Sequence, residues 1–402
     1  MDETSVSGVG QRVAEERKLA GWTQVKLARE ALVSVSLVRA VEQGRAPASP
    51  AFVSACARAL NVGVAELLEQ PYLRRNRAEH EVYACIPAIR RELAAYHIEP
   101  PDDAPLRPLD ELAQDVADAS TLRHAVNLAQ LGTELPPLLT ELRAAVYTLN
   151  GTDRERVFGL LAEAYAAAGQ VAYKLGYIDL ASLTTERYEW AAAHSGDELA
   201  VLVGDYLRAG ELIITAEWNA ALTFLEKSRS RIEPDLGKNN PVVLSVWGNL
   251  HLKSGLAAAR AGKRDLADAH LGEAKETAQR VGADRDDYRL CFGPTNVNIW
   301  SVGLAVEMLD GTEAIKRSEK FVIPPTTQRE RAGHHCIDLA RGYLLHGDKT
   351  KAFTTLRQAK DIAPTQTRYH PMVHETIRVL AREETRTTDS IRGFATWCGI
   401  RN

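Results

Sequence analysis

The feature that most constrains the fold of this chain is a succession of long helical patterns over residues 78–402. These patterns are rich in Ala and Leu and are interrupted by Gly, Asp and Asn. They contain no stretch that alternates apolar and polar residues, as a half-buried β-strand would. Apolar residues make up 45% of the chain and aromatic residues only 6%, which favours helices over sheets. We therefore predict an all-α protein.

An internal repeat runs through this helical region. Its clearest copy is residues 339–364, in which small residues recur on two helices and a Gly–Asp turn separates them. Weaker copies lie upstream, and the steps between the central alanines are 40, 46, 47 and 38 residues. A small residue in each helix of a pair lets the backbones approach, so stacked pairs bury one continuous core. The defining residues are Ala340, Tyr343, Gly347, Asp348, Ala352, Leu356, Ala359 and Pro364 in the clearest copy, and Ala181, Ala221, Ala267 and Ala314 in the others.

This pattern resembles the tetratricopeptide repeat. The resemblance implies a C-terminal α-solenoid of helical hairpins with a concave groove, where peptides or other ligands commonly bind. The steps exceed the regular unit of about 34 residues, so we expect longer helices or loops than in a regular array. The Pro-rich segment 97–108 is expected to be a loop. The final stretch 385–402 is expected to be a helix that closes the solenoid through Phe394, Trp397 and Ile400.

The first 70 residues carry five short helical patterns. Thr23, Ser34 and Ser49 each precede one of them and are expected to cap a helix with their hydroxyl groups. Pro50 suits a first helical position, and Gly44 suits a left-handed helix end. The residues expected to face the interior are Val9, Val13, Leu19, Val25, Leu27, Ala28, Val38 and Val41.

Over residues 9–68 this arrangement resembles the XRE-type helix-turn-helix that is shared with the phage Cro and CI repressors. One residue departs from the family pattern. Leu32 stands where the family usually has Gly, so the turn must hold a residue that tolerates a positive φ poorly. The motifs that carry the resemblance are TQVKLA, Ala31, Val33, Val38, Val41, EQGR and ARALNVGVAELL.

The resemblance implies which residues meet DNA. In this family the start of the second helix contacts phosphate and the first turns of the third helix face base edges. Val35 and Ala40 can contact a thymine methyl group and Ser36 can exchange a hydrogen bond, but none makes a bidentate base contact. Affinity should therefore come mainly from the DNA backbone. The alternative is a third helix that is purely structural or binds protein. The expected DNA-binding residues are Gln24, Lys26, Ser34, Val35, Ser36, Arg39, Ala40, Gln43 and Arg45.

Charge is distributed unevenly between the two regions. Residues 1–77 hold 11 Lys or Arg and 8 Asp or Glu, a net charge of +3, which leaves −7 for the rest of a chain whose total is −4. Phosphate attracts cations, so a nucleic acid should meet the N-terminal segment. Arg74, Arg75 and Arg77 can add phosphate contacts, although a solvated linker is the plainer interpretation. We expect a DNA-binding domain over 1–70, a linker over 71–80, and a repeat domain for sensing and dimerisation over 81–402.

Several classes of chemistry lack a sequence signature. The chain has no phosphate loop, HExxH motif or nucleophile elbow, so we expect neither an enzyme nor a cofactor. No run of about 18 apolar residues and no signal peptide is present, which predicts a cytoplasmic protein without a membrane span. Pro371 places His370 at a helix N-cap rather than inside a helix, so no metal site is expected around it. The scattered cysteines and clustered histidines that we considered are Cys56, Cys85, Cys291, Cys336, Cys398, His334, His335, His370 and His374.

Polar residues of the repeat region are candidates for ligand binding. Gly293 and Pro294 break the chain before a helix whose free amides and Asn side chains suit a polar or anionic ligand. A turn with an Asn cap is the alternative. Arg and aromatic side chains upstream can project into the groove, although aromatic residues at helical spacing more often belong to the core. The candidates are Arg187, Trp190, Tyr206, Arg208, Trp247, Asn249, His251, Asn296, Asn298 and Trp300.

The combination of the two regions resembles the bacterial RRNPP type of quorum-sensing regulator, and the Ala-, Arg- and Gly-rich composition suits the long regulators of actinobacteria. The resemblance implies a transcriptional regulator that binds double-stranded operator DNA and senses a peptide or small molecule. A homodimer is expected, because two half-sites ~34 Å apart double the contacts of one small domain. The alternative is a scaffold whose groove docks a partner protein and whose N-terminal domain tethers it to DNA.

Overall fold

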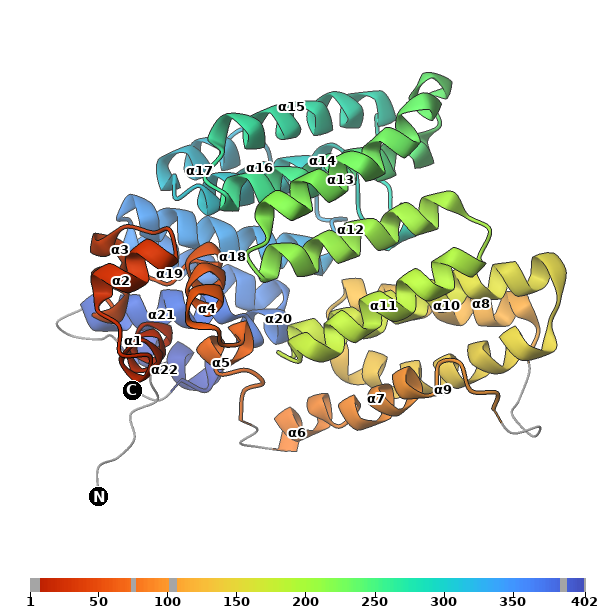
Figure 1. The fold of residues 1–402 in the computed structure, drawn as a ribbon, viewed down its shortest axis with the longest axis horizontal. Coiled ribbons are helices and arrows are strands. Elements are labelled where there is room, and N and C mark those ends of the chain that lie inside the picture. Colours follow the sequence, from red (N-terminus) through yellow and green to blue (C-terminus); the bar gives the residue numbers. More distant parts are fainter. Residues whose placement is uncertain (1–7, 74–76, 101–106, 384–388, 401–402) are drawn as a thin grey trace.

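The computed structural model describes residues 8–73, 77–100, 107–383 and 389–400, and every regular element within them is helical. The β-type pairing found in these ranges is one isolated bridge between Arg285 and Phe292. The prediction of an all-α protein is confirmed. Figure 1 shows that the chain runs from a small N-terminal group of helices through a large body and returns beside that group. Over the same ranges, no helix combines the length and apolarity that crossing a bilayer requires.

The N-terminal domain consists of the five helices that the sequence predicts. Each predicted capping hydroxyl, of Thr23, Ser34 and Ser49, accepts a backbone N–H three residues later at 3.1–3.2 Å. Pro50 is the first residue of its helix, as expected. The helices are α1 (Val9–Leu19), α2 (Gln24–Glu30), α3 (Val35–Glu42), α4 (Pro50–Leu60) and α5 (Val64–Leu68).

Two predicted core residues of this domain are wrong, because Leu19 and Val25 are exposed. The buried face of α1 continues from Val13 to the side chain of Arg17, four residues on, so Leu19 points to solvent. On α2, the position one turn before Leu27 and Ala28 is Gln24 rather than Val25. The other predicted core residues are buried, namely Val9, Val13, Leu27, Ala28, Val38 and Val41.

The first half of the body begins with α6, whose first residue Arg77 lies inside the segment expected to be a linker. The predicted Pro-rich loop falls between α7 and α8, and its residues 101–106, like Arg74 and Arg75, lie outside the described residues. The helices are α6 (Arg77–Tyr83), α7 (Ile86–Ala94), α8 (Leu109–His124), α9 (Leu128–Thr148), α10 (Gly151–Lys174), α11 (Ile178–His194), α12 (Glu198–Ile214) and α13 (Trp218–Ile232).

The second half of the body ends in α22, where Phe394 is buried, and Ile400 just after this helix is buried as well, as expected of a closing segment. Residues 385–388 and 401–402 of the predicted closing segment lie outside the described residues. The elements are η1 (Glu233–Lys238), α14 (Pro241–Arg260), α15 (Arg264–Val281), η2 (Asp287–Arg289), α16 (Pro294–Glu307), α17 (Gly311–Ser318), α18 (Arg329–His346), α19 (Lys349–Ile362), α20 (Pro364–Tyr369), α21 (Pro371–Glu383) and α22 (Asp389–Cys398).

Consecutive helices of the body pack in pairs that are joined by turns of two or three residues, as in α10–α11, α14–α15 and α18–α19. The turn between α18 and α19 places Gly347 at a φ of 98°, a value that glycine adopts without steric cost. Small side chains lie at the helix contacts, where they let the backbones approach. The alanines that defined the sequence repeat are all buried, namely Ala181, Ala221, Ala267, Ala314, Ala340, Ala352 and Ala359.

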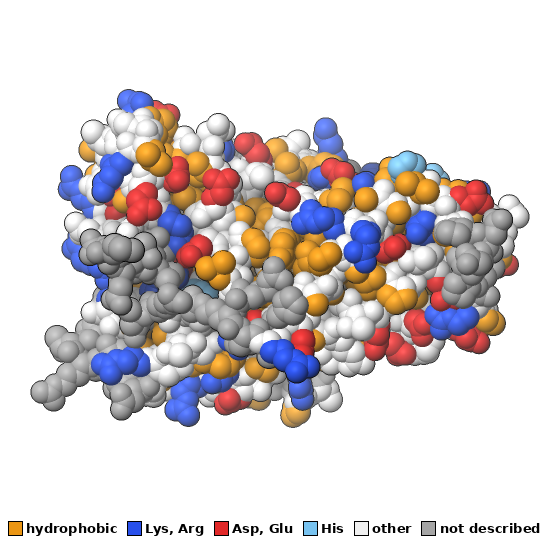
Figure 2. All heavy atoms as spheres, turned by 90° about the horizontal axis from the view of Figure 1, so that it is seen from below, with side chains coloured by type: hydrophobic (Ala, Val, Ile, Leu, Met, Phe, Trp, Pro, Cys, Tyr) orange, Lys and Arg blue, Asp and Glu red, His pale blue; other side chains and the backbone are white. Residues whose placement is uncertain are grey.

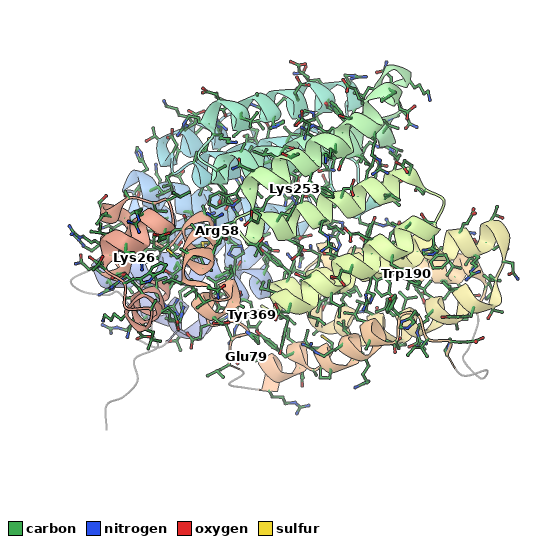
Figure 3. The ribbon with its side chains drawn as sticks, in the orientation of Figure 1. Lys26, Arg58, Glu79, Trp190, Lys253 and Tyr369 are labelled. Carbon is green, nitrogen blue, oxygen red and sulfur yellow. The ribbon has the colours of Figure 1, made fainter. Side chains whose placement is uncertain are left out.

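The last helices of the body pack against its first helix. Tyr369 of α20 packs edge-on against Tyr83 of α6, with ring centroids 5.6 Å apart. Arg368 also forms an ion pair with Glu79 of α6. Figure 3 shows Glu79 and Tyr369 on neighbouring elements below the N-terminal domain. The helices of the body therefore surround an interior instead of forming an open row.

The N-terminal domain is packed onto this closed body. Met372 of α21 belongs to the same apolar core as the buried residues of α1–α5. The backbone N–H of Val9 donates to Glu375 of α21 at 3.5 Å. On the opposite side, Arg58 of α4 faces Glu217 at 3.8 Å, and Figure 3 shows Arg58 at this border. Trp218 of α13, next to Glu217, also packs against the core of the domain, so apolar contacts with the body lie on both sides.

Candidate nucleic-acid interface and central cavity

The residues expected to meet DNA lie on the surface of α2, α3 and the turn that follows α3. Ser34, Ser36, Arg39, Gln43 and Arg45 are exposed. Lys26 is also exposed, and its ammonium group lies 4.4 Å from the centroid of the Trp22 ring. Val35 and Ala40 are half-buried at the edge of the same surface. Figure 1 shows α2 and α3 on the outer side of the N-terminal domain.

The turn between α2 and α3 contains the predicted departure from the family pattern. Leu32 adopts a φ of 55° and leaves 80% of its surface exposed. This left-handed conformation is costly for a residue with a Cβ atom. The exposed side chain makes no compensating core contact, so the turn holds Leu32 against its backbone preference.

A buried carboxylate organises the interface from beneath. Glu42 of α3 accepts hydrogen bonds from Arg17 Nε at 2.6 Å and Arg17 Nη2 at 2.9 Å. It also accepts one from Gln24 Nε2 at 2.7 Å, and Gln24 Oε1 accepts one from Arg39 Nε at 3.3 Å. Burial would raise the pKa of Glu42, but these hydrogen bonds from Arg17 and Gln24 hold it below its usual value. Glu42 therefore fixes the position of the expected phosphate contact Gln24.

A cavity of ≈ 420 Å³ lies between the N-terminal domain and the body. The wall that the N-terminal domain supplies is mostly apolar, whereas the body supplies apolar, aromatic and charged side chains. The residues from α4 and α5 are Pro50, Val53, Ser54, Val64 and Leu68. Those from the body include Tyr173, Ile178, Tyr206, Ile214, Leu256, Ile299, Trp300, Leu304, Tyr369 and Met372.

Most charged groups of the cavity wall are paired. Glu307 lies 2.9 Å from Arg260 and 3.0 Å from Arg341, and these cations overcome the effect of burial and lower its pKa to about 2. Lys253 differs, because it makes no ion pair with the part of the chain that the structure describes. Its ammonium group lies 3.9 Å from the centroid of the Tyr206 ring. Burial and the nearby Arg260 lower the pKa of Lys253 to about 8.

The structure brings only some of the ligand-binding candidates to the cavity. Tyr206, Asn249, Asn296 and Trp300 line it. The two asparagines hold the loop before α16, because Asn249 Nδ2 donates to the carbonyl of Leu290 at 3.0 Å and Asn296 Nδ2 donates to that of Cys291. The candidates that do not line the cavity are Arg187, Trp190, Arg208, Trp247, His251 and Asn298.

The candidates outside the cavity have partners within the fold. The guanidinium of Arg187 lies 3.7 Å from the ring centroid of Tyr96. Arg208 Nε donates to Glu189 at 3.0 Å. The rings of His251 and Trp247 are tilted by 58° to each other, with centroids 4.7 Å apart.

The amide end of α16, predicted to suit an anionic ligand, is used internally. The N–H of Thr295 donates to Asp284 Oδ1 at 3.0 Å. A carboxylate of the chain itself therefore occupies the position at which an anionic ligand was predicted.

Histidine and cysteine side chains also meet in a way that the sequence did not predict. His370 caps α21 as expected, since its Nδ1 accepts the N–H of Met372 at 3.2 Å. His124, Asp286 and Cys291, in contrast, form a cluster that could hold a metal ion. The first and last of these lie 167 positions apart, so spacing along the sequence gave no signal.

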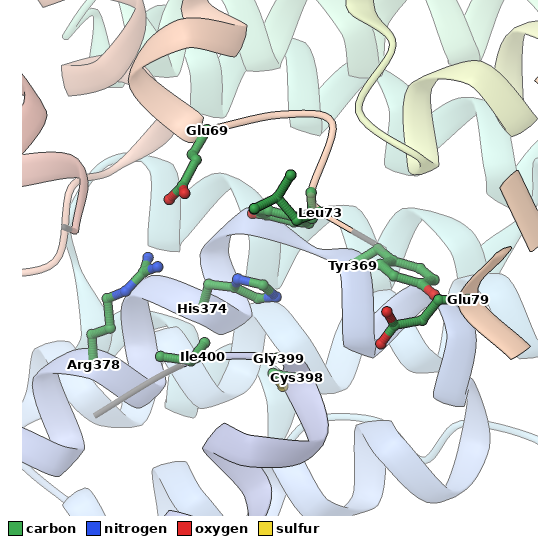
Figure 4. A pocket seen from close by; sticks show the side chains of 10 residues that line it. Glu69, Leu73, Glu79, Tyr369, His374, Arg378, Cys398, Gly399 and Ile400 are labelled. Atoms are coloured by element: carbon green, nitrogen blue, oxygen red, sulfur yellow. The ribbon is translucent and has the colours of Figure 1, made fainter. Parts of the chain in front are cut away.

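A second, much smaller pocket of ≈ 30 Å³ lies at the joint between the N-terminal domain and the body. Figure 4 shows Glu69 and Leu73 on one side of it and His374 and Arg378 of α21 on the other. Tyr72 stacks on His374 with ring centroids 4.3 Å apart. A space of this size holds about one water molecule, so the pocket is a packing feature of the joint.

The surface of the body carries both acidic and basic side chains. On the face shown in Figure 2, acidic and basic side chains are interspersed and hydrophobic side chains gather in the middle. Among the described residues of the body, this face therefore presents no extended basic surface to a nucleic acid.

Comparison with known proteins identifies the N-terminal domain. Residues 9–70 match the family described as "Helix-turn-helix domain". No curated protein matches the chain. Among solved structures, the crystal structure of BtubC (BKLC) from P. vanneervenii is similar at 18% identity and a TM-score of 0.36, over 65% of this chain and 94% of that chain. The helix-turn-helix domain supports DNA as a partner and a DNA-binding regulator as the class of this protein.

Proposed function

We propose that this protein is a sequence-specific transcriptional regulator that binds operator DNA as a homodimer and responds to a peptide or small molecule bound in the central cavity. The body would act as a solenoid of tetratricopeptide-like hairpins that encloses the ligand. The observation that carries the proposal is the shared wall of the cavity. Val53 and Val64 of the helix-turn-helix domain line the same space as Tyr206 and Trp300 of the body.

The shared wall gives a ligand a route to the DNA interface. A ligand shifts an equilibrium between two conformations only if it binds one of them more tightly. A molecule in this cavity touches α4 and α5 directly, so its affinity depends on where the helix-turn-helix domain sits. The position of this domain in turn sets the separation of the two recognition helices in a dimer, which must match half-sites ~34 Å apart.

The DNA part of the proposal is tested by selecting duplexes from a random library with the full chain and then measuring affinity for the selected site. Gln24→Ala and Arg45→Ala should each weaken binding by roughly tenfold, because each removes a contact of about 1–1.5 kcal/mol. Arg45→Ala should also flatten the fall of affinity with salt, whereas Gln24→Ala should leave that slope unchanged because glutamine carries no charge. Arg156→Ala in α10 is the matched control, since Arg156 is an exposed arginine of the body that pairs with Asp110 of α8.

The two halves of the proposal fail in different ways. If no duplex is enriched, or if Arg156→Ala weakens binding as much as Arg45→Ala, the helix-turn-helix surface is not the DNA interface. Selected sites without two-fold symmetry, bound tightly by a monomer, would contradict the homodimer. A scaffold that docks a partner protein would keep that partner when Gln24, Ser36 and Arg45 are replaced.

The ligand part is tested by native mass spectrometry of the freshly purified full chain. Gly210 of α12 lines the cavity, and a Cβ atom there would lie 3.5 Å from Lys253 Nζ. Gly210→Phe should therefore fill the cavity and abolish a retained mass. Gly272→Phe is the control, because a Cβ atom at this helical glycine meets no atom within 4 Å. A retained mass that survives Gly210→Phe would place the ligand elsewhere.

A further inference from the structure

A cluster of three metal-ligating side chains lies at the wall of the cavity, where the end of α8 meets the loop between α15 and α16. His124 ends α8, and Asp286 and Cys291 belong to the loop. One ligand atom from each lies within 4.8 Å of the other two. His124 and Cys291 also line the cavity, together with Glu330 of α18.

We propose that His124, Asp286 and Cys291, with Glu330 as a fourth ligand, bind a divalent transition-metal ion of the zinc type. One imidazole nitrogen, one thiolate and two carboxylates are donors that Zn²⁺ accepts in a tetrahedral site. Oxygen-seeking ions such as Mg²⁺ would not select the sulfur atom. The proposal concerns the body alone and does not depend on DNA binding.

The distances between the donor atoms suit such an ion. Cys291 Sγ lies 3.5 Å from Asp286 Oδ1 and 3.9 Å from His124 Nδ1. His124 Nδ1 lies 3.4 Å from Glu330 Oε2. With ordinary zinc–ligand bonds, two donors of a tetrahedral site are roughly 3.4–3.6 Å apart. These three separations lie within about half an ångström of a tetrahedral site, whereas Glu330 lies outside the 4.8 Å group and has to move further to complete it.

The surroundings hold these donors in place. Lys174 lies 2.9 Å from Glu330 Oε1, while Oε2 faces the imidazole at 3.4 Å and Arg123 Nη1 at 3.5 Å. The other ring nitrogen of His124, Nε2, lies 3.0 Å from Asp286 Oδ2, an acceptor that orients the ring. Asn296 donates to the carbonyl of Cys291 and fixes the backbone beside the thiol.

The local charge also suits a cation. Arg123 is the nearest positive side chain to the imidazole, and its Nη2 lies 2.7 Å from His124 Nε2 and donates to the carbonyl of Arg289 at 2.6 Å. Cys291 binds as the thiolate, and its proton leaves to solvent. Two carboxylates and one thiolate then face Arg123 and Lys174, which leaves a net charge of −1 for the ion to neutralise.

The proposed ion would fasten the loop to the rest of the body. Within this loop Tyr288 and Arg289 have φ values of 51° and 58°, which cost energy for residues with a Cβ atom. A bond network from Asp286 and Cys291 to α8 and α18 would hold the loop in this conformation. It would also link helices from the beginning and the end of the body at the cavity wall.

The test is titration of the full chain with Co²⁺ after treatment with a chelator. One equivalent of Co²⁺ should produce a thiolate-to-cobalt charge-transfer absorption, and Zn²⁺ should abolish it. Cys291→Ser should remove this absorption and weaken Zn²⁺ binding by at least about tenfold. Cys336→Ser is the control, because Cys336 adjoins His334 and His335 but lies outside the cluster.

A second measurement separates the loss of metal binding from the loss of folding in the variants. Zn²⁺ should raise the melting temperature of the wild type and of Cys336→Ser, but not that of Cys291→Ser or His124→Gln, each checked for native circular dichroism. The proposal is overturned if one equivalent of Co²⁺ gives no charge-transfer absorption. It is equally overturned if the absorption persists in Cys291→Ser or disappears in Cys336→Ser. The DNA selection described above is unaffected by either outcome.

Discussion

Replacing Glu42 by Ala should destabilise the helix-turn-helix domain far more than the loss of an exposed carboxylate. The side chains of Arg17 and Glu42 are only 10% and 5% exposed, and two hydrogen bonds join them. Gln24 donates a third hydrogen bond to the same carboxylate. The substitution leaves the Arg17 guanidinium buried without its counter-ion.

The size of the effect follows from burial. Removing one partner of a buried ion pair costs about 3–5 kcal/mol. Arg17 Nη1 keeps its hydrogen bond to the carbonyl of Trp22 at 2.8 Å, so we expect the lower end, about 3 kcal/mol. The exposed pair Arg29–Glu30, with side chains 75% and 40% exposed, should contribute less than about 0.5 kcal/mol. Glu30→Ala is therefore the matched control.

Hydrogen exchange of the amides in α1–α3 of the full chain measures the local free energy of opening. Exchange should accelerate by roughly a hundredfold in Glu42→Ala and by less than about threefold in Glu30→Ala. The double variant Arg17→Met/Glu42→Leu should recover most of the loss, because no charge is then left unpaired. Equal acceleration in the two single variants would refute the reasoning that burial sets the cost.

The same pair predicts a dependence on pH. The pKa of Glu42 is lowered in the folded protein, so the unfolded state binds more protons as the pH falls. The contribution of Glu42 to stability is complete above its unfolded pKa and is lost as the pH falls through its folded pKa. The difference between wild type and Glu42→Ala should therefore shrink in acid.

Three further outcomes are expected. Leu32→Gly should stabilise the helix-turn-helix domain by about 0.5 kcal/mol, measured as a higher melting temperature. Glycine adopts the φ of 55° without strain, and this gain exceeds the extra conformational entropy that glycine gives the unfolded chain. The pKa of Lys253 is lowered to about 8, so wild-type stability should rise with pH from about 8 towards the usual lysine value, and Lys253→Met should lose that rise in denaturant titrations. Gly248→Ala should lower the free energy of unfolding by about 1–3 kcal/mol and weaken cobalt binding, because its Cβ atom would lie 1.9 Å from the Phe292 ring that anchors the loop. Gly272→Ala should leave both the stability and the cobalt affinity unchanged.

The sequence predicts those parts of the fold that depend on neighbours along the chain. The hydroxyls of Thr23, Ser34 and Ser49 cap helices because the cap and its amide lie three residues apart. The repeated alanines of the body are buried because helix pairing recurs with a short period. Val25 shows the limit of this reasoning, since on a helix of seven residues a shift by one position changes the buried face.

The candidate site depends on contacts between distant segments, which periodicity does not describe. Glu42 lies in the EQGR motif, but its pairing with Arg17 requires the packing of α1 on α3. The cavity exists because the body closes on itself and receives α4 and α5 as a wall. Arginines such as Arg187 and Arg208 are typical of ligand sites, yet here their side chains contact Tyr96 and Glu189 within the fold.

The helix-turn-helix domain contacts the body at two places, and both border the cavity. On the α21 side, Met372 is part of the domain core and the N–H of Val9 donates to Glu375. On the α4 side, Trp218 of α13 packs against the same core, while the exposed ion pair between Arg58 and Glu217 spans 3.8 Å and contributes little. Met372 lines the cavity together with residues of α4, so a ligand there touches both sides of the joint. A ligand that favours one position of the domain by about 1–3 kcal/mol, a usual allosteric coupling, would be enough to shift the domain relative to the body.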